Sequence, residues 1–363
     1  MKEVIISGKY AGQRLNKFLM KYLDEAPSSF VYKMLRKKNI KLNEKKAEGN
    51  EILVEGDKVR IYLSDETIEK FQSRKKQNIK GDSLPKHDYV NKDEFTSYDY
   101  NQKNTDKIIL DILYIDDDIM AVNKPVGILS QRAKKEDYSI NDAIIDYTIE
   151  HKIIDKNELN LFKPSICNRL DRNTSGIIFA GISLKGSQQL TKAFKDRTID
   201  KYYYTIVKGC FDNEMNCKGY ITRDIKNLKS HIISEDEFYE LSSKNSKTDE
   251  LLKEYEKIET YFYPVSTNGN YSLIRVKLVT GKTHQIRAQL SNIDFNIIGD
   301  IKYGNKDVNA YMKDKYGLKN QLLHAGDVYW KEKNIKIHAG LPENFIRICE
   351  GEGIRWQPGT QEA

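Results

Sequence analysis

Residues 168–181 read NRLDRNTSGIIFAG, a polar stretch that ends at a glycine and continues directly into apolar residues. Asp171 stands between Arg169 and Arg172 in this stretch. The Ser-Gly pair that follows permits a tight turn, and the apolar residues after it predict a strand over 176–181. The sequence therefore predicts that Asp171 is fixed at the mouth of a strand.

Positive charge is concentrated at the start of the chain. The 363 residues are 39% hydrophobic and 31% charged, and this length favours two globular units. There are 60 basic and 53 acidic residues, which gives a net charge of +7. Residues 1–63 hold 14 Lys and Arg against 8 Asp and Glu, a surplus of +6. This asymmetry is typical of a nucleic-acid-binding module, although a solvated surface would also explain it.

The charge pattern bears on the role of Asp171. An aspartate beside arginines is ordinarily a turn or helix-cap residue that pairs with its neighbour. In a protein that approaches a polyanion, however, a carboxylate in a basic pocket repels the ligand and lowers the affinity. A chemical role for Asp171 is therefore the interpretation that we favour.

Several classes of protein are not indicated by the sequence. No apolar stretch approaches the roughly 18 residues of a membrane helix. The N-terminus lacks the features of a signal or transit peptide, so we expect a cytoplasmic protein. The four cysteines are scattered, with no histidine at metal-binding spacing, so we expect neither a metal site nor a disulfide framework. The carboxylates at 116–118 fall in a predicted hairpin turn and are interpreted as solvated.

Residues 1–63 predict a small α/β module. Apolar residues at helical spacing predict two basic amphipathic helices, one over 13–23 and one that begins after a cap at Ser28 or Ser29. Two hairpins follow, the second over 52–63 with its turn at a central Gly-Asp pair. The cations expected to face phosphate groups are Arg14, Lys17, Arg36, Lys37 and Lys38.

The remainder of the chain predicts a linker and a larger domain. Residues 64–106 are polar, which predicts a flexible linker with one short helix near 68–75. Interleaved helices and hairpins predict an α+β domain over 107–350, with a peripheral insertion at 210–257 and a tail at 351–363. The expected strands include 176–181, 202–209, 258–264 and 272–279, and the expected helices lie near 140–150, 184–197 and 283–293.

The stretch at 168–181 resembles the central motif of the RluA family of pseudouridine synthases, His-Arg-Leu-Asp-x-x-Thr-Ser-Gly followed by an apolar strand. Other blocks of that family are resembled, in order, by ILYIDDDIMAVNKPVGILSQ, KYYYTIVKG, LVTGKTHQIRAQL and IIGDIKYG, which together cover about residues 108–330. The chain departs from the family at Asn168, which stands where His is usual and could donate hydrogen bonds to RNA or backbone. Residues 1–63 resemble the S-four-type RNA-binding domain.

The resemblance implies a pseudouridine synthase fold, a mixed and mostly antiparallel sheet flanked by helices around a central cleft. It implies isomerisation of a flipped uridine without a cofactor, with Asp171 acting at the ribose. Arg287 is expected to hold that carboxylate through a bidentate fork, and Thr283 to cap the helix that carries it. Tyr203 is expected to stack near the uracil and to assist proton removal. From their place in the loop, Arg169 and Arg172 are expected to bind the substrate, by clamping phosphate groups or by filling the vacated position, although simple solvation of the loop would also explain them. Leu323 is expected to form an apolar wall of the pocket.

Structured RNA is the expected partner of a monomeric enzyme, with large-subunit ribosomal RNA preferred and transfer RNA as the alternative. A non-catalytic RNA-binding protein would explain the basic first module but not Asp171, Tyr203 and Arg287 within matching blocks. The sequence lacks the G-x-G-x-x-G of a base methyltransferase and the H-x-E with P-C-x-x-C of a zinc deaminase.

Overall fold

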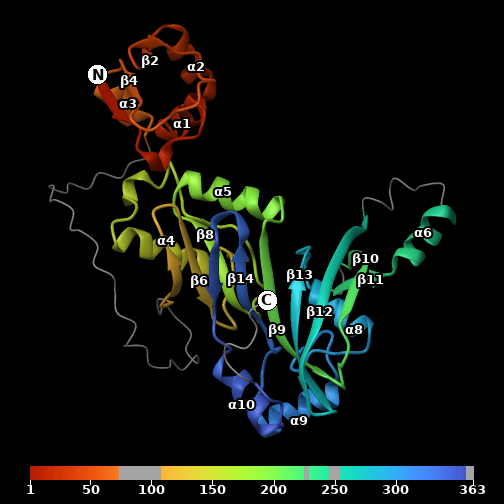
Figure 1. Ribbon diagram of the computed structural model, residues 1–363. Helices are drawn as coiled ribbons and strands as arrows, with labels where there is room; N and C mark the ends of the chain where they lie inside the picture. Colours follow the sequence, from red (N-terminus) through yellow and green to blue (C-terminus); the bar gives the residue numbers. More distant parts are fainter. Residues whose placement is uncertain (73–107, 225–228, 245–253, 357–363) are drawn as a thin grey trace. The chain divides into compact units, whose positions relative to one another are not determined.

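Two compact units make up the chain (Figure 1). The first unit comprises Met1–Ile109 with Asp155–Leu161, and the second comprises Leu110–Ile154 with Phe162–Ala363. The computed structural model describes residues 1–72, 108–224, 229–244 and 254–356. Most of the predicted linker, 73–106, therefore lies outside the described residues. No helix within the described ranges is long and apolar enough to cross a membrane.

The first unit has a four-stranded antiparallel sheet with the strand order β1-β4-β2-β3. Its elements are β1 (Lys2–Ile5), η1 (Gly8–Tyr10), α1 (Leu15–Tyr22), α2 (Ser28–Arg36), β2 (Ile40–Leu42), β3 (Lys45–Lys46), β4 (Lys58–Ile61) and α3 (Asp65–Lys70). The two amphipathic helices are confirmed, because the apolar residues at helical spacing are buried. These inward residues are Leu15, Phe18, Leu19, Leu23, Val31, Met34 and Leu35.

The second hairpin predicted over 52–63 is wrong. Only the second half of this segment forms a strand, β4, which lies between β1 and β2 and pairs with both. Both edges of β4 are therefore occupied. The first half bonds elsewhere, since Leu53 donates its backbone N–H to Gln13 and accepts one from Gly12.

The helix boundaries in this unit differ slightly from those predicted. Neither Ser28 nor Ser29 caps the second helix, because both lie inside α2 and Pro27 occupies the N-cap position. The short helix expected near 68–75 is α3, which starts directly after Ser64. The Ser64 hydroxyl accepts a backbone N–H from the first turn of α3 and so fixes the earlier start.

The second unit is built on one 11-stranded sheet with the order β11-β10-β12-β13-β9-β14-β8-β6-β5, in which β15 pairs with β14 and β7 with β8. Every pair is antiparallel except β14 with β8. The strands are β5 (Asp111–Ile115), β6 (Ile119–Lys124), β7 (Ser165–Ile166), β8 (Ser175–Gly181), β9 (Ile199–Lys208), β10 (Met215–Asp224), β11 (Lys229–Ile233), β12 (Glu256–Thr267), β13 (Tyr271–Leu278), β14 (Leu323–Trp330) and β15 (Ile335–His338). The predicted mixed, mostly antiparallel α+β architecture is confirmed.

Helices pack against this sheet through two apolar clusters. One cluster joins α5 to β6 and β8 and includes Phe179 and Leu190, and the other joins α9 and α10 to β9 and β13 and includes Met312 and Phe345. Figure 1 shows α4 and α5 near β6 and β8, with α9 and α10 at the opposite end of the unit. The helices are α4 (Ile140–Glu150), η2 (Lys156–Glu158, in the first unit's segment), α5 (Leu184–Lys195), α6 (Glu235–Lys244), α8 (Gln285–Asn292), α9 (Lys306–Tyr316), η3 (Lys331–Lys333) and α10 (Glu343–Gly351).

The parallel pairing of β8 with β14 depends on Gly176. A Cβ built on Gly176 would lie 2.2 Å from the carbonyl oxygen of Ala325, and the φ angle of 113° also disfavours other residues. The glycine of the opening motif therefore lets two backbones approach closely directly after the loop that carries Asp171.

The segment at 210–257, predicted to be a peripheral insertion, contains two strands of the main sheet. β10 pairs with β12, and β11 continues the sheet beyond β10, so this segment forms one end of the sheet. The predicted tail at 351–363 also begins inside the core. Ile354 is buried, and Trp356 makes an edge contact with the ring of Tyr204. The remaining tail, 357–363, lies outside the described residues.

Candidate active site

The loop that precedes β8 is held at both sides of Asp171. On the N-terminal side, the buried Ser130 hydroxyl donates to the carbonyl oxygen of Leu170 at 2.6 Å and accepts its N–H at 3.0 Å. Within the loop, the backbone N–H of Thr174 donates to the carbonyl oxygen of Asp171. These bonds satisfy the buried backbone of the loop and fix the direction of the Asp171 side chain.

A buried lysine holds the other side of the same loop. The Lys124 ammonium donates to the carbonyl oxygens of Arg172, Pro125 and Ile128 at 3.2, 2.9 and 2.9 Å. Three carbonyls match the three N–H groups of an ammonium. Burial lowers the pKa of Lys124 to about 7, and the negative charge of Asp171 opposes this shift. Gly127 and Arg172 complete the clamp, because each donates an N–H to the carbonyl oxygen of the other.

The end of the loop is bound to the strand that pairs with it. Gln321 donates to the Thr174 hydroxyl at 2.9 Å. The buried His324 ring lies with Nδ1 2.9 Å from the Ser175 hydroxyl and Nε2 3.1 Å from the carbonyl oxygen of Ala339. A carbonyl only accepts, so Nε2 carries the proton and Nδ1 accepts from Ser175. Burial lowers the pKa of His324 to about 4, which keeps this neutral form at neutral pH.

Asp171 and Arg287 lie together, as the resemblance implied, but the bidentate fork is directed elsewhere. Arg287 Nη1 donates to Asp171 Oδ2 at 2.7 Å. Its Nε and Nη2 instead donate to the two oxygens of Asp300, at 2.6 and 3.0 Å. The expected fork on Asp171 is therefore wrong, and a second carboxylate that the sequence reasoning did not identify takes that position.

Burial distinguishes the members of this triad. The Arg287 and Asp300 side chains are 6% and 0% exposed, whereas the Asp171 side chain is 29% exposed. Burial alone would raise the pKa of Asp300, but Arg287 and the backbone N–H groups of Lys302 and Tyr303 hold that pKa below its usual range. Burial opposes the charge on Arg287, but its two carboxylate partners outweigh this effect and raise its pKa. Asp300 is thus the anchor, and Asp171 is the accessible partner.

A histidine completes the surroundings of Asp171. His284 Nε2 lies 3.7 Å from Asp171 Oδ2, and its Nδ1 lies 3.1 Å from the Tyr303 hydroxyl. Burial lowers the pKa of His284. The negative charge of Asp171 opposes this shift, and the positive charge of Arg287 adds to it. His284 precedes α8 with a φ of 58°, so the predicted cap at Thr283 is wrong and the left-handed histidine begins the helix.

Asp171 opens into a cavity of about 390 Å³. Tyr203 on β9 and Leu323 on β14 line the cavity, and both are buried. Burial and then the negative charge of Asp171 raise the pKa of Tyr203, so the phenol is protonated at neutral pH. No described residue forms a hydrogen bond with its hydroxyl. The cavity therefore combines a carboxylate, a protonated phenol and an apolar wall.

The two arginines predicted to bind substrate lie in different surroundings. Arg169 is exposed and lines the cavity, whereas Arg172 is absent from the described lining and its Nε donates to Gly127. Asn168 lies in the lining, but its amide bonds to the backbone of β8, donating to Ile177 and accepting from Phe179. The backbone alternative for Asn168 is therefore the one observed. The five predicted cations of the first unit, Arg14, Lys17, Arg36, Lys37 and Lys38, are all exposed.

Sequence reasoning missed four residues that organise the site. Asp300 and His284 lie inside quoted blocks, IIGDIKYG and LVTGKTHQIRAQL, and could have been singled out as polar residues beside apolar runs. Lys124 and His324 sit in strands that are mostly apolar, where a charged or titratable residue was the available signal. The described residues contain no group of three or more His, Cys, Asp or Glu arranged to hold a metal ion.

Comparisons with known proteins bear on this site. The family model for RNA pseudouridylate synthase matches residues 118–292. The ribosomal large subunit pseudouridine synthase C of Rickettsia typhi is 29% identical over 346 residues, covering 92% of this chain and 95% of the relative. An uncharacterized RNA pseudouridine synthase of Mycoplasma capricolum subsp. capricolum is 31% identical over 320 residues, covering 85% and 87%. The solved structure of human RNA pseudouridylate synthase domain containing 4 shares the fold, with a TM-score of 0.53, 18% identity and coverage of 68% of this chain and 94% of that chain.

Proposed function

The chain belongs to the RNA pseudouridylate synthase family, and from this premise we propose that it isomerises specific uridines of large-subunit ribosomal RNA, with Asp171 as the catalytic carboxylate. The RNA class is supported by the name of the relative from Rickettsia typhi, which is similar over nearly the whole chain. The role of Asp171 is supported by its bond to Arg287 at 2.7 Å within a cavity that also holds Tyr203.

The reaction exchanges one bond at the ribose for another. The bond from N1 of uracil to C1′ breaks, the base rotates, and C5 forms a new bond to C1′. C5 loses its proton and N1 gains one, so the product is an isomer and no cofactor is consumed. Positive charge develops at C1′ as the first bond breaks, and an adjacent carboxylate stabilises that charge or traps it covalently.

The two oxygens of Asp171 are not equivalent. Oδ2 accepts from Arg287 and lies near His284, whereas Oδ1 accepts no hydrogen bond from any described residue. We assign Oδ1 as the oxygen presented to C1′. Arg287 then acts as a positioning residue, since it binds the opposite oxygen and leaves the reactive one free.

The cavity walls suit an extruded base. A uridine in structured RNA must leave its stack to reach a carboxylate inside a cavity, and the flipped base needs packing surfaces. We propose that the Tyr203 ring and Leu323 pack on the uracil, and that exposed Arg169 contacts the RNA around the vacated position. The Tyr203 hydroxyl is protonated in the resting enzyme, so it removes the C5 proton only as its own proton passes to Asp171 or solvent.

We further propose that the first unit binds RNA without base specificity. Its surplus of positive charge and the exposure of all five predicted cations support this role. Its small antiparallel sheet with two amphipathic helices is the architecture expected from the S-four-type resemblance.

The test is a map of pseudouridines in ribosomal and transfer RNA from cells that lack this protein. Specific sites in large-subunit RNA are expected to disappear and to return with the wild type but not with Asp171→Asn. Asp327→Asn is the matched control, because Asp327 is a partly exposed carboxylate bonded to Tyr204 and His338.

Two results would contradict parts of the proposal separately. Loss of sites from transfer RNA alone would overturn the RNA class while keeping the reaction. Full restoration by Asp171→Asn would remove Asp171 from the chemistry.

A further inference from the structure

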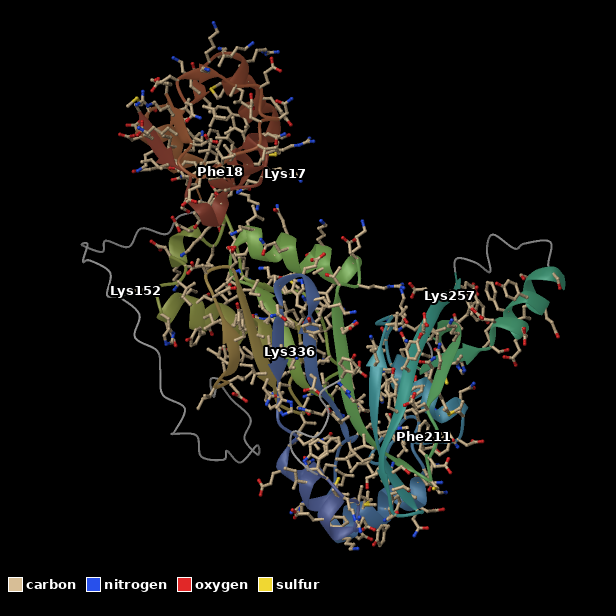
Figure 2. All side chains as sticks on the ribbon, viewed as in Figure 1. Lys17, Phe18, Lys152, Phe211, Lys257 and Lys336 are labelled. Atoms are coloured by element: carbon tan, nitrogen blue, oxygen red, sulfur yellow. The ribbon has the colours of Figure 1, made fainter. Side chains whose placement is uncertain are left out.

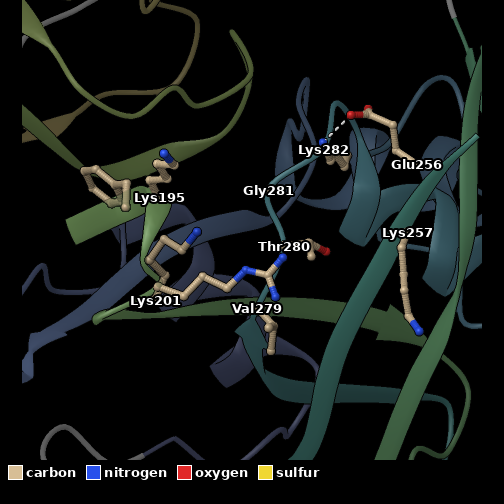
Figure 3. Close-up of a pocket in the computed structure, with 10 residues that line it drawn as sticks. Lys195, Lys201, Glu256, Lys257, Val279, Thr280, Gly281 and Lys282 are labelled. Carbon is tan, nitrogen blue, oxygen red and sulfur yellow. Dashed lines mark hydrogen bonds and ion pairs between the residues drawn. The ribbon is translucent and has the colours of Figure 1, made fainter. Parts of the chain in front are cut away.

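A second cavity of about 460 Å³ adjoins the first. The two cavities share four wall residues, Phe194, Lys201, Gly281 and Lys282, so they lie side by side. Figure 3 shows this second cavity, with Lys195 and Lys201 on one side and Lys282 and Glu256 on the other. We call it the basic cavity. Any group bound there lies directly beside whatever occupies the cavity of Asp171.

Cations dominate the wall of the basic cavity, and they fall into two groups. Lys282 pairs with Glu256, and Lys257 pairs with Glu235 outside the cavity. In contrast, no described residue supplies a hydrogen-bond acceptor or an ion-pair partner to Lys195, Arg197 or Lys201. Three neighbouring cations therefore lack a direct ion pair with the described chain, and the nearby Asp200 carboxylate acts on Lys201 only through space.

Lys201 is the most informative of the three. It is half-buried on β9, its ammonium lies against the backbone of Gly281, where a built Cβ would be 3.7 Å from Nζ, and it stands 5.9 Å from the centre of the Phe194 ring. Burial and then repulsion from Arg197 lower its pKa. Like charges held together in a partly desolvated site are unfavourable unless an anion compensates them.

We propose that the basic cavity binds backbone phosphates of the RNA strand immediately beside the uridine that enters the cavity of Asp171. This inference rests on the proposed function and adds a site for the flanking nucleotides. A flipped nucleotide remains bonded to a phosphate on each side, so the strand must pass over an adjoining surface. Lys201 lines both cavities and therefore stands where the ribose of the target meets its phosphate. The basic cavity also offsets the repulsion between Asp171 and the backbone.

The chemistry of the wall favours phosphate over a second base. Phosphates are bound by Lys and Arg without sequence preference. Bases need aromatic stacking platforms or aligned donors and acceptors. The described wall offers one aromatic ring, Phe194, and the Lys201 ammonium lies over one face of that ring.

The experiment measures how RNA binding depends on salt. The full chain, its Lys201→Met, Arg197→Met and Lys195→Met variants, and the conservative Lys201→Arg are bound to a transcript of the large-subunit ribosomal RNA between 50 and 200 mM salt. The control is Lys336→Met, which removes the same charge from an exposed lysine on β15 (Figure 2). Lys336 is not among the residues that line either cavity. Isomerisation is followed in parallel by the tritium that C5-labelled uridine releases to water.

Each of the three Met variants is expected to reduce the slope of log K against log salt by about 0.7 to 0.9, the value for one lost phosphate contact. At 150 mM salt Lys201→Met is expected to raise KM about tenfold and to change kcat less than about threefold, because the lost contact is uniform binding. Lys201→Arg keeps the charge and should keep the slope, and Lys336→Met should leave it unchanged.

Slopes of the three variants equal to that of the wild type, or a fall as large in Lys336→Met, would overturn the inference. Should Lys201→Met fail to fold, the exposed Lys195 and Arg197 carry the same expectation. If the wild type released no tritium but Lys201→Met still reduced the slope of log K against log salt, the proposed function would be overturned. The basic cavity would remain an RNA-phosphate site.

Discussion

Asp300→Asn is expected to weaken the fold and the catalytic step together. In the wild type, Oδ2 of Asp300 accepts from Arg287 Nε at 2.6 Å and Oδ1 accepts from Nη2 at 3.0 Å. Oδ1 also accepts the backbone N–H groups of Lys302 and Tyr303. Asparagine keeps one oxygen for Nη2 and the backbone, but its NH2 group then faces the Nε–H donor. One charge-assisted hydrogen bond is lost and a donor meets a donor.

The loss in stability can be bounded from the burial of the pair. Removal of one partner from a buried ion pair costs about 3 to 5 kcal/mol. Arg287 keeps Asp171 as a partner, and that carboxylate is 29% exposed, so we expect the lower end, about 3 kcal/mol. For a domain of this size each kcal/mol lowers the melting temperature by roughly 2 to 4 °C, which gives a fall of roughly 6 to 12 °C.

The catalytic loss follows from the geometry. Arg287 Nη1 fixes Asp171 Oδ2, so a guanidinium that turns away from residue 300 displaces the reactive carboxylate. A displacement on the order of 1 Å costs about 100-fold in rate. The cavity walls are unchanged, so kcat should fall about 100-fold while KM stays within about threefold of the wild type.

Calorimetric melting and tritium release from C5-labelled uridine in ribosomal RNA measure the two effects. Asp327→Asn is the control. Asp327 is partly exposed and asparagine keeps an oxygen that can accept from Tyr204, so a loss of only about 0 to 1 kcal/mol is expected. A melting temperature within 2 °C of the wild type, on the order of 1 kcal/mol, together with an unchanged kcat, would refute the view that Asp300 anchors the guanidinium.

Two other perturbations test neighbouring groups. Tyr203→Phe removes only a hydroxyl that makes no hydrogen bond with described residues, so the melting temperature should stay the same. The value of kcat should fall about 10² to 10⁴-fold, because proton transfer is lost. If the variant were as active as the wild type on C5-labelled RNA, Tyr203 would have only a packing role. The pKa of His324 is about 4 in the folded protein, against the ordinary value of 6.5 expected in the unfolded chain. Between these two pH values the unfolded chain binds the proton and the folded chain does not. Acid therefore destabilises the fold, by up to about 3 kcal/mol below pH 4. His324→Asn should remove that contribution, so its deficit in unfolding free energy relative to the wild type should shrink from pH 6.5 to 4, and a constant deficit would contradict a buried neutral imidazole.

Much of the second unit was predictable because its elements carry local signals. The strand predicted at 176–181 has four consecutive apolar residues after the Ser-Gly pair, and the helix near 184–197 has a clear apolar face. β10 and β11 were missed because their burial alternates weakly at the end of the sheet, so they lack a continuous apolar pattern. The hairpin predicted at 52–63 was wrong for a different reason. The strand in its second half, β4, pairs with β1 and β2 on its two edges, and this tertiary pairing leaves no edge for the first half of the segment.

The predicted site shows the same division. Asp171, Tyr203, Arg287 and Leu323 were identified from blocks in a fixed order, and all four line one cavity. The direction of the Arg287 fork could not be predicted from the sequence. Asp300 becomes the partner of Arg287 only when the turn that carries Asp300 folds against α8. Local sequence specifies residue types, and a hydrogen bond such as Arg287 to Asp300 depends on tertiary packing.

The charge count of the triad explains why two carboxylates share one guanidinium. Arg287 paired with Asp171 alone would neutralise the anion that must stabilise positive charge at C1′. Because Asp300 is buried and ionised, it balances Arg287, and the triad keeps a net negative charge that is accessible only at Asp171. The same negative charge repels RNA phosphates, and the unpaired cations of the adjoining basic cavity supply the opposite field. Loss of Asp300 should therefore lower kcat even where Asp171 keeps its position, whereas loss of Lys201 should act on binding.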